Sequence, residues 1–416
     1  MYVPRVLENT LKEYLNTFKA IAIVGPKYCG KTTLCEQFSN SFIYLNPINR
    51  NDYRTMLQLS GDMFFASPYP KLIDEWQLIP EVWDMVRHEV DKTNGRGLFL
   101  LTGSSAANFD ETIHSGAGRI IRMTLRTMSL YESGGSNGSI TLKEMFMNNI
   151  EPKGCSITVN DYATWIIKGG WPDSIYDSEM QAMLRMQSYV DALCKEDINK
   201  VTEKKYSENR MKKILESLAR NTASEISNVG ILNDLKYFDT SISMNTLVDY
   251  LDVLNKLYIM EDLKCWNPNL RSKTVIRTTP ARFFIDPSIG AAALKMTSGK
   301  LLNDFKTFGL FFESLAIRDI RIYAESIYGN VYRYKDKTDL EVDAIIQLND
   351  GRWGAIEIKM GSHQFDNAAN KLISFASKID ETTMGKPSFL AIISATDFAY
   401  KRNDGVLVVP LGCLRS

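Results

Sequence analysis

Cysteine and histidine are both scarce in this chain. Its 416 residues include six cysteines and three histidines, and no two cysteines form a CxxC pair. The histidines, His88, His114 and His363, are far apart in the sequence. A zinc site needs several Cys or His ligands at close spacing, and a disulfide framework needs paired cysteines. The sequence therefore signals neither kind of site.

Long apolar runs are missing as well, and so is an excess of charge of one sign. No run approaches the roughly 18 apolar residues that a membrane helix requires. The N-terminal stretch MYVPRVLENTLKEYL has no apolar core of the signal-peptide kind. Basic and acidic residues number 49 each, which argues against a highly basic coat protein. We expect a soluble, cytoplasmic protein of two or three domains with no membrane partner.

What the chain does contain is a phosphate-binding motif near its N-terminus. Residues 20–33 read AIAIVGPKYCGKTT, which contains the full pattern G-x-x-x-x-G-K-[ST]. The apolar run before the motif predicts a strand, and the segment after it predicts a helix whose N-terminus favours an anion. Lys31 is expected to reach the β and γ phosphates, and Thr32 to offer its hydroxyl to Mg²⁺. The residues expected to bind ATP are Gly25, Pro26, Lys27, Tyr28, Cys29, Gly30, Lys31, Thr32 and Thr33.

A nucleotide site of this type also needs an acidic residue at the carboxyl end of a neighbouring strand. Residues 71–76 read KLIDEW and place Asp74 and Glu75 after a short apolar run. Asp74 is expected to hold Mg²⁺, and Glu75 to orient and deprotonate the attacking water. The alternative is an Asp–Glu pair on the surface. The next apolar run, GLFLL, ends in Thr102, which can sense the γ-phosphate or place the water. We predict Lys31, Glu75 and Thr102 as catalytic residues.

The order of these segments predicts the fold class. Strand, phosphate loop, helix, acidic strand, helix and polar-tipped strand follow one another, and RIIRMTL at 119–125 supplies a further strand. This alternation is typical of an α/β fold with a parallel sheet, whose ligand lies at the carboxyl ends of the strands.

These motifs resemble a family of prokaryotic ATP-binding proteins with an AAA-type P-loop core and a C-terminal domain of uncharacterised function. The resemblance lies in GPKYCGKTT, LIDEWQLIPEVWDMVR, LFLLTGSSAANF and GAGRIIRMTLRTMSLYES, and continues in KGGWPDSIY, CKEDINK, RFFIDPSIG and FFESLAIRD. It implies an AAA-type fold and ATP binding. It also makes Arg119 a candidate for contacting the γ-phosphate, the alternative being an arginine at a strand edge. AAA-type cores often complete their site with a neighbouring subunit's arginine, so a homo-oligomer or another protein partner is expected.

The middle of the chain predicts a winged-helix-like domain. RMKKILESLAR, GILNDLKYF and SMNTLVDYLDVLNKLYI predict three helices, and strand-forming residues follow them. The next stretch, KCWNPNLRSKTVIRTTPAR, is basic and contains no acidic residue. Arg271, Lys273 and Arg277 are predicted to bind the DNA backbone. The alternatives are a surface loop or a protein-docking module, because Asp249 and Asp252 on the third helix disfavour groove reading.

The C-terminal part predicts a restriction-endonuclease-like domain. Its expected order is a helix, three strands, a helix and a strand. Side chains alternate across a strand, so Asp343 belongs to one face of its strand, and Glu357 and Lys359 share a face of the next. This pattern resembles the PD-(D/E)xK nuclease motif, although Val342 stands where that motif has proline. The resemblance implies a second Mg²⁺ site at Asp343 and Glu357, helped by Lys359 and Glu313. The alternative is the polar face of an inactive sheet.

The expected organisation has four parts. Residues 1–140 form an AAA-type P-loop ATPase core, and 141–204 a helical segment. Residues 205–298 form the winged-helix-like domain, and 299–416 the smaller nuclease-like α/β domain. The expected function is Mg²⁺-dependent ATP hydrolysis coupled to an action on DNA. The alternative is an ATP-dependent switch or protein-interaction module with an inactive nuclease-like domain.

Overall fold

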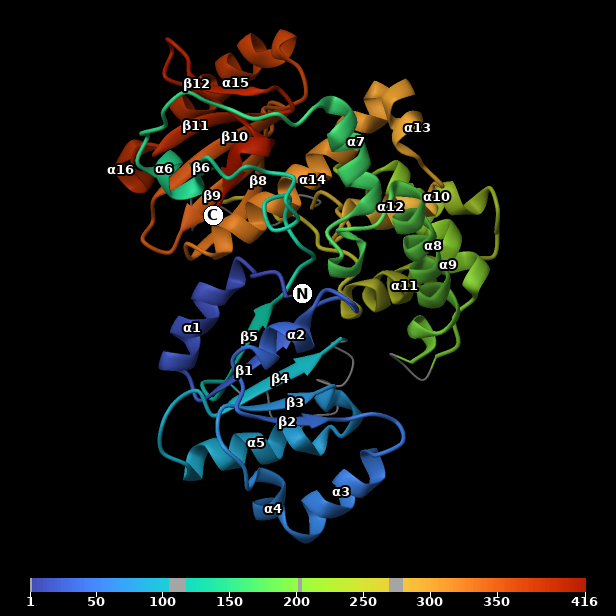
Figure 1. Ribbon diagram of the computed structural model, residues 1–416. Coiled ribbons are helices and arrows are strands. Elements are labelled where there is room, and N and C mark those ends of the chain that lie inside the picture. Colours follow the sequence, from blue (N-terminus) through green and yellow to red (C-terminus); the bar gives the residue numbers. More distant parts are fainter. Residues whose placement is uncertain (1, 105–116, 201–203, 269–279) are drawn as a thin grey trace. The chain divides into compact units, whose positions relative to one another are not determined.

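The protein is described by a computed structural model over residues 2–104, 117–200, 204–268 and 280–416. Figure 1 shows its helices and strands in sequence colours. Contacts divide the chain into two compact units. Unit 1 comprises Met1–Thr127, Glu196–Lys205 and Leu251–Ile259, and unit 2 comprises Met128–Lys195, Tyr206–Tyr250 and Met260–Ser416.

Unit 1 is built on a parallel five-stranded sheet. Its order is β2 (Ser41–Tyr44), β3 (Lys71–Asp74), β4 (Phe99–Gly103), β1 (Ala20–Val24) and β5 (Ile120–Thr124). All four neighbouring pairs are parallel. The last residues of β1, β4 and β5 are aligned, because Val24 pairs with Gly103 on one side and with Thr124 on the other. The carboxyl ends of the central strands therefore meet at one edge, as predicted for an α/β fold.

Helices cover both faces of this sheet (Figure 1). One face packs against α1 (Leu7–Thr17) and α2 (Lys31–Glu36), through a buried cluster that includes Leu11 and Leu34. The other face packs against a second cluster, to which α3 (Arg50–Leu59), α4 (Gly61–Phe65) and α5 (Glu81–Lys92) contribute. The strands that carry the acidic pair and Thr102 are thus enclosed on both faces, which holds their polar ends in fixed positions.

The middle of the chain is helical. The three predicted helices are present as α9 (Glu208–Arg220), α10 (Asn228–Lys236) and α11 (Met244–Lys256). Short antiparallel bridges after these helices join Met260 to Phe284 and Leu263 to Ala281, and a third bridge joins Ser224, between α9 and α10, to Arg282. The remaining helices of this region are α6 (Leu142–Phe146), α7 (Val159–Lys168), α8 (Glu179–Lys195), α12 (Pro287–Ala293) and α13 (Ser298–Asn303).

The C-terminal part of unit 2 is a second α/β layer. It begins with α14 (Phe305–Glu325), and its hairpin turn at 349–351 contains Gly351 at φ 91°. The sheet has the order β7-β12-β13-β11-β10-β9-β8. Its elements are β7 (Lys153–Gly154), β8 (Gly329–Lys335), β9 (Glu341–Leu348), β10 (Trp353–Lys359), α15 (Phe365–Lys378), α16 (Glu381–Met384), β11 (Phe389–Ser394), β12 (Phe398–Lys401) and β13 (Leu407–Pro410). A separate small pair joins β6 (Ile140–Thr141) to β14 (Leu414–Arg415). The predicted order of helix, three strands, helix and strand is present.

A buried ionic network anchors α14 within unit 2. The guanidinium of Arg318 pairs with Asp286 at 3.0 Å and with Asp319 at 2.8 Å. Asp286 also accepts from the N–H of Gly170, and Asp319 from the N–H of Leu130, each at 2.9 Å. Buried charges need partners of this kind, because an unpaired one costs several kcal/mol. The network brings together four of the quoted motifs and gives them a packing role.

Within the described ranges, no helix combines the length and the apolar character that crossing a bilayer requires.

Candidate functional site

The phosphate-binding motif forms a tight loop between β1 and α2. Gly25 has φ 152°, and a Cβ added there would lie 2.1 Å from the carbonyl oxygen of Leu125. Only glycine fits this position. Tyr28 and Gly30 are left-handed, at φ 62° and 95°. These turns curl the backbone so that its N–H groups and the start of α2 can face one bound anion.

The ammonium group of Lys31 lies inside this loop. Its side chain is buried, and Nζ donates hydrogen bonds to the carbonyl oxygens of Gly25, at 3.0 Å, and Pro26, at 2.7 Å. The positive charge is therefore held at the point on which the loop converges. A phosphate group bound there would meet it directly.

The predicted acidic residue meets the loop through a hydrogen bond. The hydroxyl of Thr32 donates to Asp74 Oδ1 at 2.8 Å, and the hydroxyl of Thr102 donates to the same oxygen. The carboxyl ends of β3 and β4, which are far apart in the sequence, thus both lie beside the first turn of α2. A hydroxyl and a carboxylate side by side are hard oxygen ligands, and this set fits a magnesium ion that also binds phosphate.

Glu75 follows Asp74 in a constrained backbone conformation. Its φ is 55°, which is uncommon for a residue with a side chain and occurs often at functional sites. Its N–H donates to the Thr102 hydroxyl at 3.3 Å. The carboxylate accepts from the amide of Gln77 and, at 3.3 Å, from the hydroxyl of Ser104. Polar donors from two elements therefore orient the predicted base.

A second group of charged side chains lies in unit 2. Asp343 Oδ2 on β9 accepts from Lys359 Nζ at 2.9 Å and from the N–H of Ile358 at 2.7 Å. Lys359 on β10 also lies 2.9 Å from Glu357 Oε2. The structure thus brings together the predicted Asp343, Glu357 and Lys359. It adds Lys371 of α15, whose Nζ is 2.9 Å from Glu357 Oε1 and which the sequence reasoning missed.

An irregularity in strand pairing places Asp343. Tyr332 of β8 pairs with Ile345 of β9, but Tyr334 pairs with Val342. Asp343 and Ala344 therefore both lie opposite one residue of β8. Such a bulge locally changes the direction of side chains and is common beside functional sites.

Burial and neighbouring charge shift the pKa values in this group. Burial raises the pKa of Glu313, on α14, well above its usual value, and the carboxylate of Asp343 adds to this. Burial also raises the pKa of Glu357. Burial alone would lower the pKa of Lys359, but the carboxylates of Asp343 and Glu357 raise it instead. The cluster thus favours a charged lysine.

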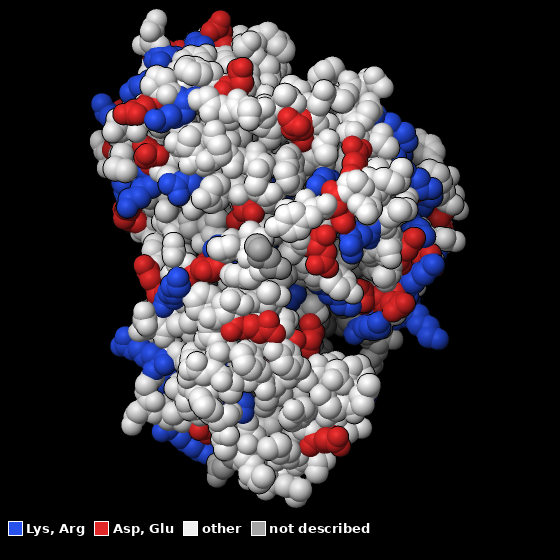
Figure 2. Space-filling view, in the orientation of Figure 1, with Lys and Arg blue, Asp and Glu red and all other residues white. Residues whose placement is uncertain are grey.

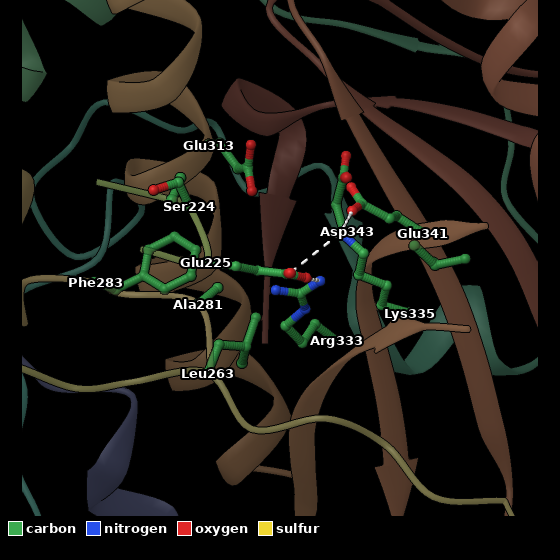
Figure 3. A pocket seen from close by; sticks show the side chains of 12 residues that line it. Ser224, Glu225, Leu263, Ala281, Phe283, Glu313, Arg333, Lys335, Glu341 and Asp343 are labelled. Atoms are coloured by element: carbon green, nitrogen blue, oxygen red, sulfur yellow. Dashed lines mark hydrogen bonds and ion pairs between the residues drawn. The ribbon is translucent and has the colours of Figure 1, made fainter. Parts of the chain in front are cut away.

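A cavity of about 260 Å³ adjoins this cluster. Glu313 and Asp343 line it from α14 and β9, and Figure 3 shows both side chains at its wall. Glu225 pairs there with Arg333 and, at 3.1 Å, with Lys335. Among the residues that the structure describes, no group of three or more His, Cys, Asp or Glu side chains could hold a metal ion. As arranged, Asp343 Oδ2 and both carboxylate oxygens of Glu357 lie beside ammonium groups and do not form a ligand set that fits a metal.

Comparison with known families assigns the three parts of the chain. Residues 17–133 match the model of the AAA domain. Together with the phosphate loop and its acidic partner, this match decides the class. The chain is an AAA-type P-loop ATPase. Residues 159–300 match a domain of unknown function, DUF8612, and residues 308–414 match another, DUF4143.

Solved structures similar to this ATPase include nucleotide-binding proteins at low identity. The Walker-type ATPase PABY2304 of Pyrococcus abyssi is 12% identical, with a TM-score of 0.41, over 69% of this chain and 94% of that one. The ORC2 protein of Aeropyrum pernix, in ADPNP and ADP complexes, is 11% identical, with a TM-score of 0.30, over 72% and 92%. DnaA of Aquifex aeolicus, bound to AMPPCP, is 13% identical, with a TM-score of 0.23, over 60% and 86%. No curated protein sequence matches the chain.

Arg119, predicted to contact the γ-phosphate, is not brought to the nucleotide site of its own chain. Arg119 precedes β5, and the pairing of Ile120 with Ala20 puts it at the amino edge of the sheet, opposite the phosphate loop. There it pairs with Asp91 at 2.8 Å, and its hydrogen bond lowers the pKa of that carboxyl. It is not placed to contact a nucleotide in its own chain. The predicted DNA contacts, Arg271, Lys273 and Arg277, lie outside the described residues.

Two residues that support the phosphate loop were missed by the sequence reasoning. Buried Arg5 donates to the carbonyl oxygen of Cys29 at 2.8 Å. Lys27 pairs at 2.5 Å with Asp197, in a short 3-10 helix (Asp197–Asn199) that belongs to the same unit. Nothing in the sequence marks Arg5. Asp197 is part of the quoted motif CKEDINK, which carried no assigned role.

Proposed function

We propose that this ATPase hydrolyses ATP with Mg²⁺ at the phosphate loop, with Glu75 as the general base. The observation that carries the proposal is the contact of Thr32 and Thr102 with the same oxygen of Asp74. Lys31 binds the β and γ phosphates, and the loop backbone from Gly25 to Thr33 binds the remaining oxygens. Thr32 and Asp74 would hold the magnesium ion, which supplies charge neutralisation on the phosphates when it is bound.

Glu75 performs the proton transfer in this proposal. Its carboxylate is oriented by Gln77 and Ser104, and its N–H is fixed by Thr102. An oriented carboxylate can align a water molecule with the γ-phosphate and accept its proton. Thr102 links the two acidic residues, so it positions both.

The proposal is tested by separating binding from hydrolysis. We expect Lys31→Ala to abolish ATP binding, because it removes the ammonium group that hydrogen-bonds inside the phosphate loop. We expect Glu75→Gln to bind ATP normally but to hydrolyse it about 10² to 10⁴ times more slowly, since only proton transfer is lost. Nucleotide affinity is measured by titration and turnover by phosphate release. Normal turnover of Glu75→Gln would assign the base to another group.

A second candidate function is an action on DNA through residues 205–416. The order α14–β8–β9–β10–α15–β11 supports a nuclease-like fold for residues 299–416, and the convergence of Asp343, Glu357 and Lys359 supports a site on it. The helices α9 to α11, followed by short antiparallel bridges, support a winged-helix-like domain at 205–298. The nuclease-like proposal depends on the order of its elements and on the positions of Asp343, Glu357 and Lys359. The winged-helix proposal depends on the order of its elements alone.

The charge distribution bears on this second candidate. On the face in Figure 2, basic and acidic side chains are interspersed among neutral ones. The whole chain has equal numbers of basic and acidic residues, so it does not attract nucleic acid by its average charge, and the proposed affinity depends on a local contact such as Arg271, Lys273 and Arg277. The alternative function is an ATP-dependent switch or protein-interaction module, in which the nuclease-like domain is a scaffold.

DNA cleavage distinguishes these candidates. Plasmid and single-stranded DNA are incubated with the protein and Mg²⁺ or Mn²⁺, with and without ATP, beside an Asp343→Ala variant. Cleavage that is lost in Asp343→Ala would support the nuclease function. A triple Arg271, Lys273 and Arg277→Ala variant is expected to weaken DNA binding and reduce its salt dependence. Absence of both cleavage and DNA binding at low salt would leave the switch function.

A further inference from the structure

The side-chain amide of Gln77 contacts one particular oxygen of the Glu75 carboxylate. Gln77 lies in a short 3-10 helix (Trp76–Leu78), which begins directly after the left-handed Glu75 at the end of β3. Its amide nitrogen donates to Glu75 Oε2, and the hydroxyl of Ser104 donates to the same oxygen at 3.3 Å. None of the described residues donates a hydrogen bond to Glu75 Oε1. The two oxygens of this carboxylate therefore have different surroundings.

The end of β4 fixes the position of the Gln77 amide. A Cβ added at Gly103 would lie 2.8 Å from Gln77 Oε1 and 3.1 Å from the ring nitrogen of Trp76. The Trp76 ring is itself buried and packs against Trp83, with the ring centroids 4.9 Å apart. The amide thus occupies the space that a glycine leaves beside an anchored ring. A donor held by packing in this way restricts the rotation of the carboxylate that it contacts.

We propose that Gln77 is a positioning residue for ATP hydrolysis, which holds Glu75 by Oε2 so that Oε1 accepts the proton of the attacking water. The inference rests on the proposed role of Glu75 as the general base. In this step the water oxygen bonds to the γ-phosphorus and its proton passes to Oε1. The bond between the γ-phosphorus and the β,γ-bridging oxygen breaks, and ADP leaves with its electron pair. Gln77 itself acts only on the direction of the base.

The test separates turnover from ATP binding in a variant that loses the amide. Gln77→Met keeps an unbranched side chain but removes the donor to Oε2. We expect it to lower kcat about 10- to 100-fold, because a misdirected base transfers the proton less often. The KM for ATP and the affinity for ATP should stay as in the native protein, since the phosphate loop is unchanged. Turnover is measured by phosphate release from the full-length protein with Mg²⁺, and affinity by titration.

A matched variant controls for the substitution itself. Gln58→Met replaces an exposed glutamine on α3 of the same unit, and it should leave kcat unchanged. The melting temperature of both variants is measured as well. A glutamine that only stabilised the fold would lower the melting temperature and would not affect kcat separately from KM.

A double variant shows whether Gln77 acts through Glu75. Once Glu75→Gln has removed the base, the direction of that side chain no longer matters for proton transfer. Adding Gln77→Met should therefore cause no further loss of kcat. Losses that multiply in the double variant would mean that Gln77 acts independently of Glu75, and would overturn the inference.

The single variants distinguish failure of the inference from failure of the proposed function. An unchanged or higher kcat in Gln77→Met, together with slow hydrolysis by Glu75→Gln, would remove the positioning role and leave Glu75 as the base. Normal hydrolysis by Glu75→Gln would remove the proposed base and the positioning role together.

Discussion

Single residue pairs adjust the charge at the phosphate loop. Lys31 points into the loop, whereas Lys27 is partly exposed and pairs with Asp197 at 2.5 Å. A carboxylate so close to the loop opposes the approach of a triphosphate, and it also neutralises a lysine that could attract one. Asp197 therefore acts on nucleotide affinity through Lys27.

We predict that Asp197→Asn tightens ATP binding several-fold. The substitution removes one negative charge and leaves Lys27 free to attract the phosphates, and the effect should weaken as salt is added because the pair is partly exposed. Affinity is measured by titration with a fluorescent ATP analogue at low and high salt.

The control is Asp191→Asn, which removes a pair of similar type, with Lys212 at 2.8 Å, in unit 2. It should leave ATP affinity unchanged. Weaker ATP binding in Asp197→Asn would instead show that the pair maintains the shape of the loop.

At the scale of elements, the nucleotide site depends on a turn that only one residue type permits. The chain leaves β1 at Val24, and the N–H of Leu125, after β5, donates to the Val24 carbonyl oxygen at 2.8 Å. The next residue, Gly25, therefore runs against the backbone of Leu125. Strand pairing and loop shape are coupled at this point.

We predict that Gly25→Ala abolishes ATP binding and lowers the melting temperature of the protein. The added Cβ would lie 2.1 Å from the Leu125 oxygen, so the loop or the end of β5 must shift. Gly118→Ala is the matched comparison. It also has positive φ, 77°, but no atom of the described residues lies within 4 Å of the added Cβ, so the backbone cost of about 1–2 kcal/mol is the expected effect.

Thermal unfolding and ATP titration of both variants check this prediction. Similar losses in the two variants would mean that backbone strain alone, and not the contact with Leu125, makes glycine necessary.

At the scale of the whole molecule, motifs that are far apart in sequence meet in one of two ways. Those of residues 20–104 meet at the carboxyl edge of the parallel sheet. Those at 129–132, 169–171, 286–290 and 313–319 meet in the buried network around Arg318. The first set carries the nucleotide site, and the second holds α14 in the fold. The family resemblance in the sequence included both sets of motifs, but it did not show that one set forms the nucleotide site and the other packs around α14.

The sequence by itself determined the phosphate loop, the α/β order of its domain and the acidic pair after β3. These features are local, because a strand, a glycine-rich turn and a helix are specified by neighbouring residues. It also indicated the elements of the C-terminal layer, whose alternation is again local.

Only the tertiary structure decided which side chains share a site. Lys371 and Glu357, and Lys27 and Asp197, are paired through packing between elements that sequence spacing does not relate. Arg119 lies at the opposite edge from the phosphate loop because strand direction, set by the parallel register, fixes which end of β5 meets the nucleotide. The bulge beside Asp343 depends on the pairing of β8 with β9, and a pattern along one strand contains no information about its partner.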